Sequence, residues 1–181
     1  KIVTVDVDHP DIEEFIDWKV VEEQKVAALV AGSKSTAKHL GAVMDACNVD
    51  EYKKDDLYDT KINKKLKEAV LNARSVMIPE NYIQRVIQFA KQGFKEIEFK
   101  TYDTDWDSEA YLTVSGQNSN NSIRVTNDFL EKVENNNDWE LIRRTDGKVF
   151  KKVKAKELWN KITEAAWACA DPGLQYDSTI N

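Results

Sequence analysis

The chain has 181 residues, of which 41% are hydrophobic and 32% charged, as in an ordinary globular domain and unlike a disordered chain. Its 26 Lys and Arg residues against 32 Asp and Glu residues give a net charge of -6, which argues against a large nucleic-acid footprint. Two cysteines are too few for a disulfide framework and favour a reducing, cytoplasmic compartment, and no apolar run reaches the roughly 20 residues of a membrane span.

The first residues alternate with the period of a β-strand and then change to the period of a helix. The spacing predicts a buried strand over residues 1–8 and a helix that starts near Pro10 and packs inward through Ile12, Phe15 and Ile16. A strand that leads directly into a helix is half of a β-α-β unit, so the pattern indicates an α/β fold.

Residues 26–93 carry an almost continuous helical pattern. The predicted helices are 33–47, 56–74 and 79–93, the last with a proline at its start and a glycine at its end. Residues 94–102 alternate in strand fashion, with Ile97 and Phe99 on one face.

The last third of the chain mixes strands and helices. The first predicted elements are a strand at 110–115, a polar loop at 116–122 and a strand at 123–125. A helix follows, capped by Thr126 or Asn127 and ending near 133. The remaining elements are a hairpin of 139–143 with 149–153, a helix at 155–170 and a strand at 174–176. The hairpin is the clearest signal, because Asp146-Gly147 is a favoured turn pair between two alternating runs.

Four acidic or imidazole side chains near the first strand, Asp6, Asp8, His9 and Asp11, are the nearest approach to a metal cluster. Asp6 and Asp8 would share one face of a strand, and His9 could add a nitrogen ligand. The favoured interpretation is a cap and a dipole charge where the strand ends and the helix starts, because no second ligand group is evident.

The nucleophile candidates have weak support. Cys47 lies beside Asp45 and Asp50, which disfavours a thiolate, and Cys169 follows alanines on a helix, so both are interpreted as structural. His39 has no Ser, Cys or Asp at an informative spacing for a catalytic triad.

Two polar stretches leave alternatives open. The basic run of residues 151–156 is interpreted as a solvated strand and helical turn, with phosphate binding as the alternative. The amide-rich stretch 116–122 (GQNSNNS) suits recognition of sugar hydroxyls, phosphates or backbone groups, and equally suits a polar turn. The residues alone therefore predict an α/β fold and no assembled active site.

Three separated segments resemble adenosylcobalamin-dependent, class II ribonucleotide reductases. They are 3–19 (VTVDVDHPDIEEFIDWK), 118–139 (NSNNSIRVTNDFLEKVENNNDW) and 153–181 (VKAKELWNKITEAAWACADPGLQYDSTIN). The last two also resemble the class I large subunit in weaker form. The resemblance predicts three parts: a barrel strand and helix over 1–25, a mostly helical class II insertion over 26–109, and barrel strands, hairpin and helices over 110–181.

The resemblance implies a portion of a ten-stranded α/β barrel that reduces ribonucleotides to deoxyribonucleotides for DNA synthesis. In the family, adenosylcobalamin generates a thiyl radical on a cysteine of a finger loop with an Asn-any-Cys-any-Glu pattern. That pattern is absent here, and neither Cys47 nor Cys169 falls in a matching motif, so no catalytic residue is assigned. Lys1 is expected to border the effector-specificity loop, and Asn118, Asn120 and Asn121 to line a loop near a strand end beside substrate or effector.

The chain starts in mid-strand without an initiating Met, which predicts a piece of a longer protein. By itself the piece is expected to be inactive and to bind neither cobalamin nor ribonucleotide tightly. It is also expected to associate through its open strand edges. The expected partners are the rest of the reductase chain, a ribonucleoside diphosphate and a deoxynucleotide effector. Neither a nucleic acid nor a membrane is expected as a partner. The sequence does not decide whether the protein forms a homodimer or whether the substrate is a triphosphate. The alternatives are a non-catalytic binding module related to the reductase and a small metal-dependent enzyme that uses Asp6, Asp8 and His9.

Overall fold

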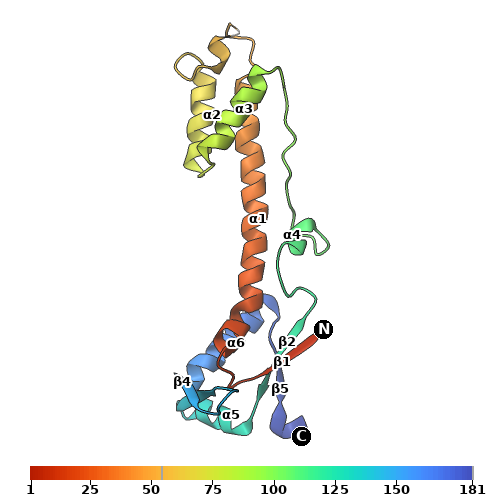
Figure 1. The fold of residues 1–181 in the computed structure, drawn as a ribbon, viewed down its shortest axis with the longest axis vertical. Coiled ribbons are helices and arrows are strands. Elements are labelled where there is room, and N and C mark those ends of the chain that lie inside the picture. The colour runs from red at the N-terminus through yellow and green to blue at the C-terminus, as the bar shows by residue number, and fades with distance from the viewer. Residues whose placement is uncertain (54, 181) are drawn as a thin grey trace. The chain divides into compact units, whose positions relative to one another are not determined.

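The computed structural model describes residues 1–53 and 55–180, and the chain divides into two compact units (Figure 1). The sheet unit comprises Lys1–Val26 and Tyr111–Asn181, and the helical unit comprises Ala27–Ala110. The first division falls inside one continuous helix, α1 (Ile12–Ala46). The separate helix predicted at 33–47 is therefore wrong in its start, because α1 contains no proline and its middle is rich in strong helix formers.

The sheet unit contains a parallel sheet and an antiparallel hairpin. The elements after the start of α1 are β2 (Asn120–Val125), α5 (Asn127–Glu134), β3 (Asp138–Ile142), β4 (Val149–Lys154), α6 (Ala155–Cys169), β5 (Gly173–Tyr176) and α7 (Asp177–Ile180). The first strand, β1 (Ile2–Asp6), pairs with β2, and β2 pairs with β5, all in parallel, whereas β3 and β4 pair antiparallel. The predicted α/β class is confirmed, as are the hairpin and the final strand.

One face of the parallel sheet packs against the apolar core of the sheet unit. The core residues come from the strands and from α1, α5 and α6, and include Ile12, Ile16, Ile123, Val125, Phe129, Leu158 and Ile162. Thr126 begins α5 as predicted, since its hydroxyl accepts a hydrogen bond from the Phe129 N–H at 3.3 Å. The cap at Thr126 and the core-facing periodicity therefore both specify a helix at α5.

Two predicted strands are wrong, and in each case the segment pairs with no strand among the described residues. Residues 110–115 overlap α4 (Glu109–Leu112), a single helical turn with Ala110 buried. Residues 94–102 form no strand, although Ile97 and Phe99 pack against the core of the helical unit as the alternation implied. Alternation specifies which side chains turn inward, but a strand also needs a neighbour for its backbone groups.

The first two strands also differ from expectation at their amino ends. Ile2 is 75% exposed and Val3 37% exposed, so β1 is not the buried strand predicted, because it pairs on one side alone among the described residues. Conversely, Asn120 and Asn121 lie in β2 and not in a loop. The Asn120 N–H donates to the carbonyl of Lys1 at 2.8 Å, which draws the amide-rich stretch into the sheet.

The helical unit packs three helices around its own core. Besides the end of α1 it contains η1 (Asp56–Tyr58), α2 (Lys64–Ser75) and α3 (Glu80–Lys91). The core residues include Leu40, Val43, Met44, Leu66, Val70, Ile83, Val86 and Ile87. Pro79 and Gly93 bracket α3 as predicted, whereas α2 starts at Lys64 and not near 56, because the Asn63 side chain caps it there. Within the part of the chain that the structure describes, every helix is too short or too polar to span a lipid bilayer.

An ion pair between the ends of α2 and α3 supplies a test of the helical unit. Two hydrogen bonds from Arg74, at 2.8 and 2.9 Å, and one from Gln84 lower the pKa of Glu80 from 4.5 to about 2. Since the folded pKa is depressed, the contribution of this pair to stability is present above pH 4.5 and is lost as the pH falls towards 2.

We therefore expect the Glu80 carboxyl carbon to titrate in NMR with a midpoint near 2. Arg74→Gln should move that midpoint up towards 4.5, because the largest cause of the depression is removed, and Gln84→Ala should move it by less. A midpoint near 4.5 in the unmodified protein would contradict the geometry of this pair.

Candidate functional site

The polar face of the parallel sheet is the side opposite the apolar core. Side chains alternate along a strand, so Thr4 on β1, Ser122 and Arg124 on β2, and Gln175 on β5 share this face. The Gln175 amide donates to the Thr4 hydroxyl at 3.1 Å, over the middle strand. The face therefore carries hydroxyl, amide and guanidinium groups where the other face carries aliphatic side chains, an arrangement able to bind a polar ligand.

Charged residues gather at the carboxyl ends of the strands. Arg144, from the hairpin, donates to both oxygens of Asp8 at 2.5 and 3.2 Å and lies 3.6 Å from Asp6. The hydrogen bond to Asp8 raises the pKa of Arg144. On the polar face, the Nε of Arg124 lies 3.7 Å from Asp177. This edge therefore alternates negative and positive groups from segments far apart in the sequence.

The arginine changes the interpretation of the acidic cluster seen in the sequence. Asp6 and Asp8 share the cation of Arg144, and Nδ1 of His9 accepts a hydrogen bond from the Asp11 N–H at 3.1 Å. Among the described residues, no three His, Cys, Asp or Glu side chains are grouped so that they could hold a metal ion. The geometry gives no support to the metal-dependent alternative.

The amide-rich residues lie at the opposite edge, at the amino ends of the strands. The backbone nitrogen of Lys1 donates to the carbonyl of Asn118 at 2.9 Å, and Asn120 bonds back to Lys1. Asn121 is 5% exposed, and its N–H donates to the Asp171 carboxylate at 3.1 Å. The structure thus joins Lys1, Asn118 and Asn120 through backbone bonds, with Asn121 next along β2, and leaves the side chains of Asn118 and Asn120 exposed.

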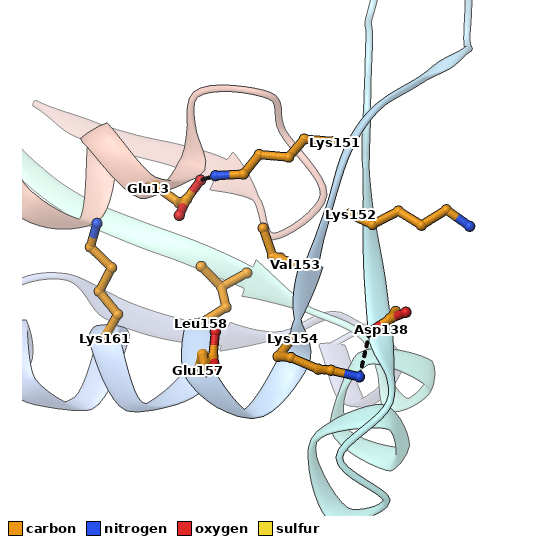
Figure 2. Close-up of a pocket in the computed structure, with 9 residues that line it drawn as sticks. All are labelled: Glu13, Asp138, Lys151, Lys152, Val153, Lys154, Glu157, Leu158 and Lys161. Carbon is orange, nitrogen blue, oxygen red and sulfur yellow. Dashed lines mark hydrogen bonds and ion pairs between the residues drawn. The ribbon is translucent and has the colours of Figure 1, made fainter.

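The basic run lines an open hollow of about 460 Å³ beside the hairpin (Figure 2). Figure 2 shows Lys151 directed at Glu13 and Lys154 at Asp138. The ion pairs here are Lys151–Glu13 at 2.5 Å, Lys152–Glu140 at 2.7 Å, Lys154–Asp138 at 2.7 Å and Lys161–Asp17 at 2.7 Å. Because each of these lysines already has a carboxylate, the hollow fits a solvated face better than a phosphate site.

The cysteines and His39 take no part in a nucleophilic arrangement among the described residues. Burial raises the pKa of Cys47 to about 11, and burial also raises the pKa of Cys169. Both thiols are free, and high thiol pKa values disfavour the thiolate that a nucleophile needs. His39 lies on α1 and makes no side-chain hydrogen bond or ion pair with a described residue.

Sequence reasoning missed the residues of the polar face and Arg144. One signal was present: Arg124 stands between Ile123 and Val125, and a charged residue inside an apolar strand indicates a second, polar face. Arg144 carried no comparable signal, because its contacts with Asp6 and Asp8 join residues 136 or more positions apart.

Comparison with known proteins connects this sheet to a family. A sequence model of the ribonucleotide reductase barrel domain matches residues 1–181. The chain belongs to the ribonucleotide reductase family. This confirms the resemblance predicted from the three segments.

The reductase relatives are far longer than this chain. It is 62% identical to the vitamin B12-dependent ribonucleotide reductase of Agrobacterium fabrum and 61% identical to that of Bradyrhizobium diazoefficiens, over all 181 residues in each case. It is 34% identical to the vitamin B12-dependent ribonucleotide reductase of Streptomyces avermitilis over the same span. The chain covers 14% of the length of the first two relatives and 12% of the third.

Proposed function

We propose that the chain is part of an adenosylcobalamin-dependent ribonucleoside-diphosphate reductase, in which it forms a stretch of the wall of a ten-stranded α/β barrel. The observation that carries the proposal is the parallel sheet with one apolar face and one polar face. Parallel sheets are normally covered on both faces, so a polar face that is open among the described residues is what a barrel wall would present to its interior.

The names of the relatives support the cofactor and the substrate class. The three relatives described above are named as vitamin B12-dependent, and one from Thermoplasma acidophilum, 41% identical over 64 residues, is named as a ribonucleoside-diphosphate reductase. Neither Cys47 nor Cys169 falls in the Asn-any-Cys-any-Glu pattern of the family's radical cysteine. We therefore assign cobalamin binding and the radical cysteine to other parts of the parent protein.

Within this proposal, the two edges of the sheet have different tasks. Ligands of α/β barrels bind at the carboxyl ends of the strands, so Arg124 and the Asp6–Arg144 pair are proposed to lie on the substrate side. Lys1, Asn118, Asn120 and Asn121, at the amino ends, are then proposed to border the effector loop. The chain would position and orient the substrate, and would supply no reacting sulfur.

The helical unit is proposed to be the class II insertion over residues 26–109, between barrel segments 1–25 and 110–181. The two compact units, which divide at Val26 and Ala110, support this assignment. The free cysteines support a reducing, cytoplasmic compartment.

The test uses the full-length protein that contains this chain, assayed for adenosylcobalamin-dependent reduction of a ribonucleoside diphosphate. Arg124→Met keeps an unbranched apolar stem but removes the guanidinium and its charge. We expect kcat/KM to fall about tenfold to a hundredfold, the contribution of a hydrogen bond to a charged group. Arg143→Met, on the exposed hairpin, should leave kcat/KM within about twofold, because surface pairs contribute little.

A double variant, Cys47→Ser with Cys169→Ser, is the matched control for the scaffold role. It should retain turnover, because neither thiol reacts in this proposal. Loss of turnover by a folded double variant would contradict the scaffold role. A full-length protein with no reductase activity at all would favour the non-catalytic binding module.

A further inference from the structure

The helical unit carries an apolar hollow that the scaffold role does not use. It encloses about 340 Å³ next to α1 and α3, and we call it the aromatic hollow. Its walls are Leu40, Phe89, Ile97 and Phe99, and Arg85 lies at its rim. Pockets lined mostly by apolar and aromatic side chains with one charged group are typical of binding sites.

The charge at this rim is not neutralised. The guanidinium carbon of Arg85 lies 5.4 Å from the centroid of the Phe89 ring, and Arg85 forms no ion pair with any described residue. In contrast, Arg74 and Arg144 each pair with a carboxylate. A guanidinium stacked on an aromatic ring still presents its N–H edge to a carboxylate, so the aromatic hollow fits an apolar group that carries negative charge beside it.

The same unit exposes a group of that chemistry. Trp106 is 87% exposed and stands between Asp105 and Asp107, neither of which pairs with a described cation. A tryptophan side chain buries about 150–250 Å² when it docks. Trp and Arg are also enriched among the interface residues that contribute most of the binding free energy. An exposed tryptophan flanked by unpaired carboxylates is therefore complementary to the aromatic hollow.

The loop that carries the tryptophan is already ordered. The Asp105 N–H donates to the Asp103 carboxylate at 3.1 Å, and the Ser108 hydroxyl donates to the Asp103 carbonyl at 3.0 Å. An ion pair between Lys100 and Glu109 closes the base of the loop. With these bonds in place Trp106 stays exposed, so the loop can present it to another copy without rearranging.

We propose that Trp106 of one copy of this chain inserts into the aromatic hollow of a second copy, where Asp105 or Asp107 pairs with Arg85. In the proposed assembly the contact is reciprocal around a two-fold axis, with each copy giving its loop to the other, so the assembly closes as a dimer. The charge pair aligns the loop, and the indole supplies most of the buried apolar area.

The test uses two differently tagged copies of the full-length protein, produced together and purified through both tags in succession. One copy carries the photoreactive residue benzoylphenylalanine in place of Trp106. We expect light to join the two copies, with the adduct mapped to peptides that contain Phe89 or Phe99 of the second copy. Arg85→Glu in the second copy alone should reduce the joined product about tenfold.

Lys38→Glu in the second copy is the matched control, since Lys38 is an exposed cation of the same unit outside the hollow. It should leave the yield unchanged, and charge exchange, with Asp105→Lys and Asp107→Lys facing Arg85→Glu, should restore it. The proposal is overturned if no doubly tagged species is recovered, if the adducts lie within one copy, or if Lys38→Glu lowers the yield as much as Arg85→Glu.

Discussion

Replacing Phe129 with alanine is expected to lower the free energy of unfolding of the sheet unit by about 3–5 kcal/mol. The side chain is 0% exposed, and its ring contacts two tryptophans, Trp139 at 5.1 Å and Trp159 at 6.5 Å between centroids. Removing it leaves a cavity where α5, β3 and α6 meet, because three rigid elements cannot close over the space. Hydrogen exchange of the α5 and β3 amides, followed by mass spectrometry, measures the loss.

Phe150→Ala is the matched control for this prediction. Phe150 lies on β4 and is 58% exposed, so its truncation should change the free energy of unfolding by about 0.5 kcal/mol or less. Equal effects of the two substitutions would show that Phe129 does not hold the core together as the structure indicates.

Asn63→Ala is expected to lower the free energy of unfolding of the helical unit by about 2–4 kcal/mol. Asn63 is 0% exposed, and its amide oxygen accepts from the Leu66 N–H at 2.9 Å, which caps α2. Its amide nitrogen donates to the carbonyls of Ala46 and Leu57 at 2.7 and 2.8 Å. Alanine would leave these backbone groups without the bonds that compensate their burial, and exchange of the α2 amides measures the result.

Two further variants separate the cap from the other bonds. Asn63→Ser keeps a capping oxygen but cannot reach both carbonyls, so its effect should fall between those of the wild type and Asn63→Ala. Asn72→Ala, at an exposed position on α2, should stay within about 0.5 kcal/mol of the wild type. If Asn63→Ser were as damaging as Asn63→Ala, the cap would contribute nothing measurable.

The polar face and the core of the sheet unit are two consequences of one strand geometry. In β2, Ile123 and Val125 turn to the core and Arg124 turns away, so the strand that stabilises the unit also presents a cation on its other side. The core-facing residues fix the register against β1 and β5, and the register then fixes where Arg124 lies relative to Gln175. Stability and the proposed positioning role therefore depend on the same pairing.

Elements specified by neighbouring residues were predictable. The hairpin follows from Asp146-Gly147 between two alternating runs, and α5 follows from the Thr126 cap before Phe129. The stretch at 94–102 was not predictable as irregular, because its alternation is genuine and the missing partner strand is a property of the whole fold. The same limit applied to Asn120, which a bond to Lys1 draws into β2.

The amino-acid sequence by itself determined the family, the α/β class and the absence of an Asn-any-Cys-any-Glu pattern, since these depend on motifs, periodicity and residue identity within short windows. Only the tertiary structure decided which polar residues share a face and which charges cancel. Arg144 meets Asp8 across 136 positions, and Gln175 meets Thr4 across 171, because parallel strands bring distant segments into register. Long-range pairing of this kind leaves no local pattern, and so it can be read only from the folded chain.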